Sequence, residues 1–124
     1  MELIPIAIDF TYLNTLTEGD KVFEQILLKC TIDDIDTRIE GLKNSWKLRN
    51  VADIRENAHS LVSLSAIAGL PQVVGWSRMI DQKFADGVFH SEMEIHVINI
   101  ISTWAEARVE LKKITSEDFV LQPN

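Results

Sequence analysis

The chain contains one cysteine, three prolines and five glycines among its 124 residues. A single cysteine excludes an internal disulfide, and without a cluster of cysteines and histidines we expect no metal site. So few prolines and glycines leave little material for the turns of a loop-rich all-β fold. We interpret Cys30 as a small buried hydrophobic residue, which suits a reducing, cytoplasmic location.

Long apolar runs and positive charge are also scarce. No window approaches the roughly 20 apolar residues that a membrane span requires. The apolar start MELIPIAIDF is short, lacks basic residues and contains Pro5, so it does not predict a signal peptide. The 12 Lys and Arg against 19 Asp and Glu give a net charge of −7. This balance argues against nucleic acids and anionic membranes as partners, so we expect proteins, or small molecules carried by proteins.

What the sequence does contain is a repeated pattern of helix start signals followed by apolar residues at helical spacing. We expect Asp9 to cap a short helix, and Thr17 to Asp20 to form a capping box before a long helix from about Glu18 to Lys47. The long helix carries one apolar series that leads into a second, with steps of four and three residues that are typical of a bundle helix. The first series is Phe23, Ile26, Leu27 and Cys30, and the second is Leu28, Ile32, Ile35, Ile39, Leu42 and Trp46.

Three more helices follow after short connections. Asn50 can cap a helix from Val51 to about Ala68, and Gly69 is a natural stop before Pro71 opens the next helix. Ser91 to Glu94 matches a capping box that would begin a last helix. The expected buried sides are Val51, Ile54, Ala58, Leu61, Ser65 and Ala68; then Val73, Trp76, Ile80 and Phe84; then Val97, Ile98, Ile101, Trp104 and Ala105.

These helices predict an all-α fold. Short connections make consecutive helices antiparallel neighbours, so we expect an up-down-up-down antiparallel four-helix bundle with a short additional N-terminal helix. Residues 1–124 would form a single domain with a core over about 9–115. The tail, 116–124, is expected to fray, although Phe119 and Leu121 could fold back onto the bundle.

Few residues offer chemistry. No G-x-S-x-G, phosphate-binding loop or dinucleotide-binding motif is present, nor is the Glu-x-x-His pattern of di-metal bundles. We interpret His90 and His96 as ordinary polar residues, since the only acidic neighbour noted at helical spacing is Glu92, four residues before His96. The acidic stretch from Asp33 to Asp36 is expected to be a solvated helix face.

His59 is the exception, because the helical wheel separates it from the core. At about 100° per residue, the apolar stripe of its helix centres about 130° away from the imidazole. The outer face around it is formed by Arg55, Glu56, Val62, Ser63 and Ala66. After His59 this face has no long charged side chain, so another protein could approach the ring closely. The sequence offers no carboxylate to orient the ring, and a plain surface histidine remains the alternative interpretation.

The segment AHSLVSLSAIAG resembles the signature of histidine-containing phosphotransfer (HPt) domains, with Ala58, His59, Leu61, Ser65 and Gly69 in register. The opening IDFTYLNTL and the following GDKVFEQILLKC resemble the family's first helix and the start of its second. The resemblance implies that His59 accepts a phosphoryl group from a receiver-domain aspartate and passes it on. It implies partners in hybrid sensor kinases and response regulators, with Mg²⁺ supplied by the receiver and no cofactor of the chain's own.

The chain departs from the family pattern at two positions. Val62 stands where the family usually has a lysine that faces the phosphoryl group, and Ser63 where it usually has glycine. Arg55 is our first candidate to supply the missing positive charge, with Arg78 and Lys83 as others. We expect Glu56, Val62, Ser63 and Ala66 to contact the partner.

The sequence thus predicts a cytoplasmic, monomeric phosphorelay carrier that acts as a phosphotransfer intermediate rather than as a self-contained enzyme. One alternative is a degenerate adaptor that docks a receiver or kinase without carrying phosphate. Another is a helical bundle with an unrelated protein-interaction role. If His59 were buried, or if the Val62 and Ala66 face packed into the core, both HPt interpretations would fall and this last alternative would remain.

Overall fold

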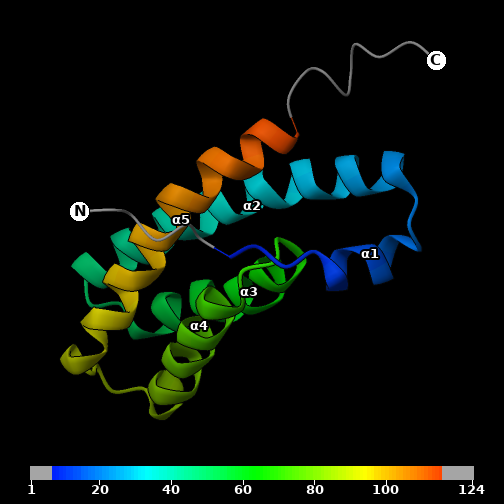
Figure 1. The fold of residues 1–124 in the computed structure, drawn as a ribbon. Helices are drawn as coiled ribbons and strands as arrows, with labels where there is room; N and C mark the ends of the chain where they lie inside the picture. Colours follow the sequence, from blue (N-terminus) through cyan, green and yellow to red (C-terminus); the bar gives the residue numbers. More distant parts are fainter. Residues whose placement is uncertain (1–6, 116–124) are drawn as a thin grey trace.

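The computed structural model describes residues 7–115, which form an all-helical bundle (Figure 1). Its helices are α1 (Thr11–Thr17), α2 (Lys21–Lys47), α3 (Val51–Ile67), α4 (Pro71–Lys83) and α5 (Glu94–Ile114). Two short 3₁₀ helices, η1 (Phe84–Asp86) and η2 (Ser91–Met93), connect α4 to α5. The predicted four-helix bundle with a short N-terminal helix is confirmed.

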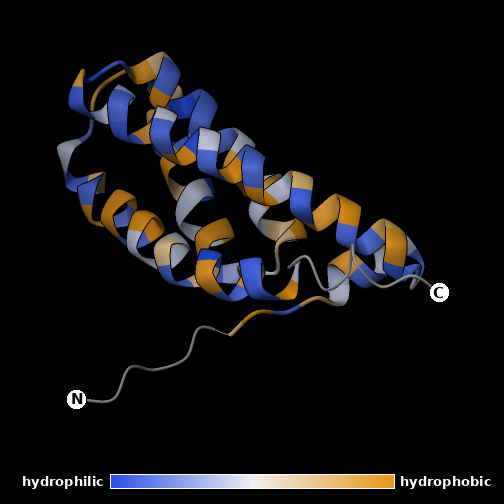
Figure 2. Ribbon diagram, turned by 90° about the horizontal axis from the view of Figure 1, so that it is seen from above, coloured by the Kyte–Doolittle hydropathy of each residue, from blue (hydrophilic) through white to orange (hydrophobic). Residues whose placement is uncertain are grey.

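The four long helices pack in a ring in which each contacts two neighbours. Helix α3 lies between α2 and α4, while α5 closes the ring by packing on α4 and α2 (Figure 1). Helices α3 and α5 are therefore diagonal to each other. Hydrophobic and hydrophilic residues alternate along every helix (Figure 2), as amphipathic helices around a single core require.

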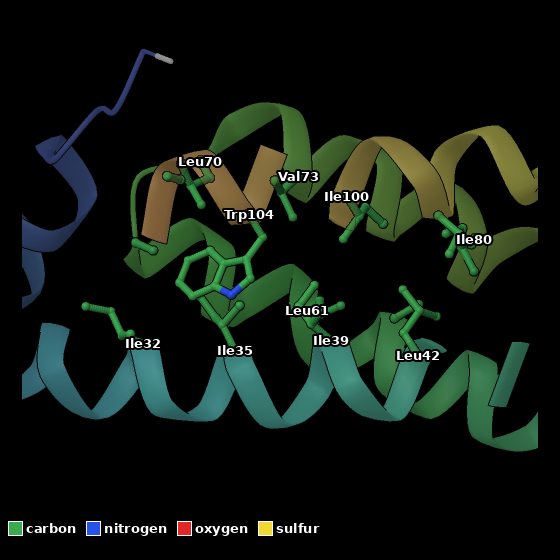
Figure 3. Close-up of a cluster of buried hydrophobic side chains, with 14 of the residues drawn as sticks. Ile32, Ile35, Ile39, Leu42, Leu61, Leu70, Val73, Ile80, Ile100 and Trp104 are labelled. Carbon is green, nitrogen blue, oxygen red and sulfur yellow. The ribbon is translucent and has the colours of Figure 1, made fainter. Parts of the chain in front are cut away.

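The core is centred on the second apolar series of α2. In Figure 3 its residues Ile32, Ile35, Ile39 and Leu42 face side chains from α3, α4 and α5. Among those partners are Leu61, Val73, Ile80, Ile100 and Trp104, all of them buried. Burying each large aliphatic side chain contributes about 1.5–3 kcal/mol, so this layer fixes how α3 and α4 are oriented. The second predicted series of α2 and the predicted stripe of α3 are confirmed, with Trp46 and Val51 at their ends only partly buried.

Two predicted capping boxes are wrong. Thr17 is the last residue of α1, where its hydroxyl donates to the Leu13 carbonyl at 3.0 Å. Asp20 caps α2 instead, because its side chain accepts from the Phe23 N–H at 3.1 Å. Ser91 lies inside η2, and neither η2 nor α5 begins with a side-chain cap.

Other predicted helix ends are confirmed. The Asn50 side chain accepts from the Asp53 N–H at 3.2 Å at the start of α3. The predicted cap at Asp9 is the exception: the N-cap of α1 is Phe10, and Asp9, one residue earlier, only accepts from the Thr11 N–H at 2.9 Å. Gly69 ends α3 with a φ of +77°, and Pro71 is the first residue of α4.

Several residues expected in the core lie at the surface. Cys30, Phe23 and Ile26 are exposed, because their series lies on the side of α2 opposite Leu28 and Ile32 and only one side can face the core. On α5, Ile98 and Ala105 are exposed as well, since Val97, Ile100, Trp104, Ala107 and Leu111 form the buried side. Within 7–115, no helix is long and apolar enough to cross a membrane. Phe119 and Leu121 of the predicted tail lie outside the described residues.

Candidate functional site

His59 lies in the middle of α3 and points away from the bundle. Its side chain is 77% exposed, whereas Ala58 and Leu61 beside it are fully buried. This arrangement follows from the register of α3, in which the buried stripe fixes the opposite face toward solvent. The exposure predicted from the helical wheel is confirmed, so the HPt interpretations pass the test that a buried His59 would have failed.

A carboxylate does orient His59, contrary to the sequence interpretation. The Nδ1 atom of His59 lies 2.9 Å from Oδ2 of Asp81, which α4 contributes. Asp81 is only 17% exposed, so the imidazole lies over a largely covered carboxylate. The signal that could have found it is the α3–α4 turn: both residues are 11 positions from Leu70 (70 − 59 and 81 − 70), so antiparallel helices bring them level.

Arg55, one turn before His59, binds the same carboxylate. Its Nε donates to Oδ1 of Asp81 at 3.1 Å. Partial burial alone would raise the pKa of the Asp81 carboxyl, but the hydrogen bonds and positive charges of His59 and Arg55 lower that pKa below its usual value. Asp81 is therefore an ionised acceptor at neutral pH, held between two donors from α3.

An ionised carboxylate can only accept, so the Nδ1 of His59 carries the proton in this contact. In a neutral imidazole the other nitrogen, Nε2, then has the free lone pair. Among the described residues Nε2 makes no hydrogen bond, and the side chain is mostly open to solvent. In the neutral form of the ring, the site thus presents one oriented nitrogen with a free lone pair to an incoming group.

The face beyond His59 has the bare character that the sequence predicted. Val62 and Ala66 are half-buried, and Ser63 is exposed with its hydroxyl 3.3 Å from the Ser60 carbonyl. Glu56 is exposed and lies 4.0 Å from Arg38 of α2. The structure therefore places all these residues around His59 on the outer side of α3.

Two shallow hollows flank this face. One, of about 360 Å³, lies between α2 and α3 and is lined by Asp34, Thr37, Arg38, Ser60, Ser63 and Leu64. The other, of about 420 Å³, joins α1 to the α3–α4 turn and is lined by residues that include Tyr12, Thr15, Ala66, Pro71 and Val74. Ser63 and Ala66 thus lie at the edges of hollows that the sequence did not reveal.

Helix α1 reaches the α3–α4 turn because Gly69 lets two backbones meet. The Asp9 N–H donates to the Gly69 carbonyl at 2.9 Å. A Cβ at residue 69 would collide with the Asp9 carbonyl oxygen. This close approach places Tyr12, which is 50% exposed, beside the outer end of α3.

Two of the other titratable candidates, His90 and Lys83, are engaged elsewhere. His90 pairs with Asp86 (Nε2 to Oδ2, 2.9 Å) and lies 3.5 Å from Glu92, so the expected spacing of Glu92 to His96 is not the contact that forms. Lys83 lies 3.8 Å from Glu92, away from His59. Within 7–115, no group of three or more His, Cys, Asp or Glu side chains could hold a metal ion.

The acidic stretch of α2 divides into two kinds of residue. Asp33 and Asp34 are exposed, as predicted for a solvated face. Asp36 instead accepts hydrogen bonds from two residues of α5: Nε1 of Trp104 at 2.8 Å and Nε of Arg108 at 2.9 Å. Asp36 therefore links α2 to α5 and has no part in the surface around His59.

Comparisons with known proteins identify the fold. No protein-family model and no curated protein matches the sequence. The structure, however, is similar to the HPt domain of a sensor hybrid histidine kinase from Shewanella, with a TM-score of 0.78 and 14% identity over 89% of this chain and 94% of that domain. It is also similar to histidine-containing phosphotransfer protein B of Pseudomonas aeruginosa, with a TM-score of 0.76 and 18% identity over 87% and 93% of the two chains. The chain has the fold of the histidine-containing phosphotransfer domains.

Proposed function

We propose that this protein is a phosphorelay phosphocarrier of two-component signalling, in which His59 shuttles a phosphoryl group between receiver-domain aspartates. The observation that carries the proposal is the geometry of His59: an exposed ring whose Nδ1 is held by Asp81 and whose Nε2 is free. It stands at the signature-like segment of a chain with the fold of HPt domains.

The chemistry requires little from the carrier. Nε2 attacks the phosphorus of an aspartyl phosphate, a P–N bond forms, the P–O bond to the receiver breaks, and the aspartate leaves as a carboxylate. Nδ1 keeps its proton, which Asp81 accepts as a hydrogen bond while positive charge develops on the ring. The reverse sequence returns the phosphoryl group to a second receiver, so transfer is reversible.

Positive charge near the phosphoryl group is the weakest element of the site. Val62 supplies none, and Lys83 is turned toward Glu92. Arg55 is the best candidate, because only its Nε is bound to Asp81 and the rest of its half-exposed guanidinium has no hydrogen bond within the described chain. Arg78, exposed on α4 one turn before Asp81, is the next.

The partner surface we propose is the bare face of α3. A receiver would contact Glu56, Val62, Ser63 and Ala66. The short side chains of the last three let it reach Nε2 closely. The hollows beside Ser63 and Ala66 extend this surface toward α2 and α1. The chain's net charge of −7 makes nucleic acid an unsuitable alternative partner.

The receiver supplies the reacting aspartate and its Mg²⁺, and the carrier needs no cofactor of its own. The protein is then a phosphotransfer intermediate rather than an enzyme with a substrate pocket. We propose that it works in the cytoplasm, where receivers and kinases are found and where its one cysteine stays reduced.

The test is phosphoryl transfer from labelled receivers. The purified protein is mixed with phosphorylated receiver domains from the source organism, and the product is examined for acid-labile, base-stable label. We expect label on the wild type and none on the variant His59→Gln. His90→Gln is the matched control, because His90 also contacts a carboxylate but lies at the α4–α5 connection, and it should be labelled like the wild type.

The same experiment distinguishes the adaptor alternative. A wild-type protein that binds receivers but takes up no label from any of them would be an adaptor, and the carrier proposal would be wrong. Binding is measured separately by titrating an unphosphorylated receiver and following the amide signals of residues 56–66.

A further inference from the structure

Helix α5 is apolar on two opposite sides. Its inner side is the buried row that ends at Leu111. Its outer side carries Ile95, Ile98 and Val109, which are 55%, 52% and 55% exposed. The sequence analysis had assigned Ile98 to the core, and the structure leaves it in solvent. A helix of a single bundle needs only one apolar side, so the outer side calls for a partner.

The outer side has the regular spacing of a helix-pairing surface. Ile95, Ile98, Ser102, Ala105 and Val109 follow one another in steps of three and four residues, and we call these five residues the outer stripe. At about 100° per residue they fall within an arc of about 80°. The two ends carry large residues and the middle carries small ones, which lets a second helix approach closely at the centre.

The charges beside the outer stripe indicate what covers it. Glu94 and Lys112 lie at the same angle around α5, on one edge of the outer stripe, but at opposite ends of it. Neither side chain forms an ion pair within residues 7–115, whereas several other charged residues of that part do. This edge is therefore acidic at one end and basic at the other.

We propose that the outer stripe is an interface with a second copy of this chain, with the two α5 helices antiparallel. A two-fold axis beside Ser102 places Ile95 against Val109 of the other copy (95 + 109 = 2 × 102) and Ser102 against itself. The same axis preserves the edges, so Glu94 lies two residues, about 3 Å along the helix, from the level of the other copy's Lys112 (94 + 112 = 2 × 102 + 2). This offset is within reach of the two long side chains, and the pair occurs twice. In a parallel pair the two edges are exchanged, so Glu94 and Lys112 would not face each other and this ion pairing would be lost.

The interface leaves the site around His59 open. Helix α3 is diagonal to α5 in the bundle, and the outer stripe faces away from the core, so both copies present His59 on their outer surfaces. The proposal does not rest on the proposed function. It departs from the monomer expected from the sequence, in which nothing demanded a dimer.

The first test measures self-association by sedimentation over a concentration series up to about 1 mM. We expect a monomer–dimer equilibrium in the wild type. Glu94→Lys alone and Lys112→Glu alone should each weaken association about tenfold, and the double exchange should restore it. A wild type that is a monomer at every concentration, or a double exchange that fails to restore association, overturns the proposal.

Two further variants guard against misfolding and non-specific association. Ile98→Glu should abolish the dimer, whereas Met79→Glu, at a similarly exposed position of α4, should leave it intact. In a Cys30→Ser background, Ser102→Cys should form a disulfide-linked dimer under mild oxidation, and a cysteine at residue 79 should not. Equal cross-linking at residues 79 and 102 would mean random collision and would overturn the assigned axis.

Discussion

The Nδ1 atom of His59 and the Oδ2 atom of Asp81 lie 2.9 Å apart and join the outer face of α3 to α4. The contact is asymmetric in exposure, because the imidazole is 77% exposed and the carboxylate beneath it only 17%. A histidine on a helix surface ordinarily samples several rotamers. Here the carboxylate fixes the ring and selects the nitrogen that faces solvent.

We predict that Asp81→Asn slows phosphoryl transfer to His59 about 10- to 100-fold, the effect typical of removing the hydrogen-bond partner that orients a metal-binding histidine. The amide can still accept from Nδ1, but it carries no charge to stabilise the imidazolium that forms. The measurement is the rate of label transfer from a phosphorylated receiver. Asp86→Asn, at the carboxylate that contacts His90, is the control. An unchanged rate in Asp81→Asn would show that Asp81 has no role in the reaction.

We predict that Val62→Lys prolongs the life of the phosphorylated protein. A lysine one turn after His59 adds a charge-assisted hydrogen bond worth about 1.5–3 kcal/mol, which corresponds to roughly tenfold or more in rate. The measurement is the half-life of the labelled protein after the receiver is removed. Val62→Met, with similar length and no charge, should not change it.

If Val62→Lys has no effect, the required charge is already present. Arg55→Gln then decides whether Arg55 supplies it, since this change should shorten the half-life in the wild type and not in Val62→Lys. A half-life that is insensitive to both changes would exclude the phosphate-supporting role that we propose for Arg55.

We predict opposite effects for alanine at two glycines. Gly69→Ala should destabilise the protein by about 2 kcal/mol or more, because residue 69 has a φ of +77° and its new Cβ would collide with the Asp9 carbonyl. Gly75→Ala, inside α4 with open space around it, should stabilise the protein by up to about 1 kcal/mol. Urea unfolding measures both, and a stable Gly69→Ala would contradict the close contact of α1 with the α3–α4 turn.

We predict that stability falls in acid through Asp36 and Asp81. Partial burial raises the pKa of each carboxyl, but hydrogen bonds and nearby cations lower it by more than burial raises it. Both pKa values in the folded protein therefore lie below the usual value. A lowered carboxyl pKa stabilises the fold above the unfolded pKa of about 3.9, and this stability is lost as the pH falls through the folded pKa. The urea midpoint should therefore drop between about pH 5 and pH 2.

Asp36→Asn tests the source of this acid sensitivity. It should cost about 1 kcal/mol at neutral pH, because the carboxylate is partly exposed, and it should reduce the drop in the urea midpoint between neutral and acidic pH. Asp33→Asn, at an exposed neighbour without an ion pair in the described structure, should do neither. If the urea midpoint depended on pH identically in the Asp36→Asn variant and the wild type, Asp36 would not be a source of the acid sensitivity.

The sequence predicted the fold well where one side of a helix is unambiguous. The second apolar series of α2, from Leu28 to Leu42, is buried as predicted, and so is the stripe of α3 from Ile54 to Ala68. Because the apolar stripe of α3 is unambiguous, the sequence also predicted that His59, on the opposite side of this helix, is exposed. Where apolar residues lie on opposite sides of a helix, as on α5, hydrophobic periodicity does not show which side faces the core. Ile98 was therefore predicted to be buried, although it lies on the exposed side.

The sequence predicted only the part of the site that lies on a single helix, α3. The residues around His59 on α3 follow from the wheel, but Asp81 comes from α4, and its position depends on how the two helices are aligned. No local pattern marks Asp81 as different from other surface aspartates. The contact of Asp81 with His59 can be inferred only by aligning α3 and α4 about the turn at Leu70, which brings the two residues level.

If His59 carries a phosphoryl group as we propose, the contact of Arg55 with Asp81 affects the stability of the phosphorylated state. The Arg55 guanidinium already neutralises the carboxylate of Asp81, so a phosphoryl group on Nε2 must share one cation with an existing anion. The phosphorylated state is then less stabilised than it would be beside a dedicated lysine, and its group-transfer potential is correspondingly high. Such a carrier releases its phosphoryl group readily to an acceptor aspartate, which suits a relay intermediate better than a long-lived store.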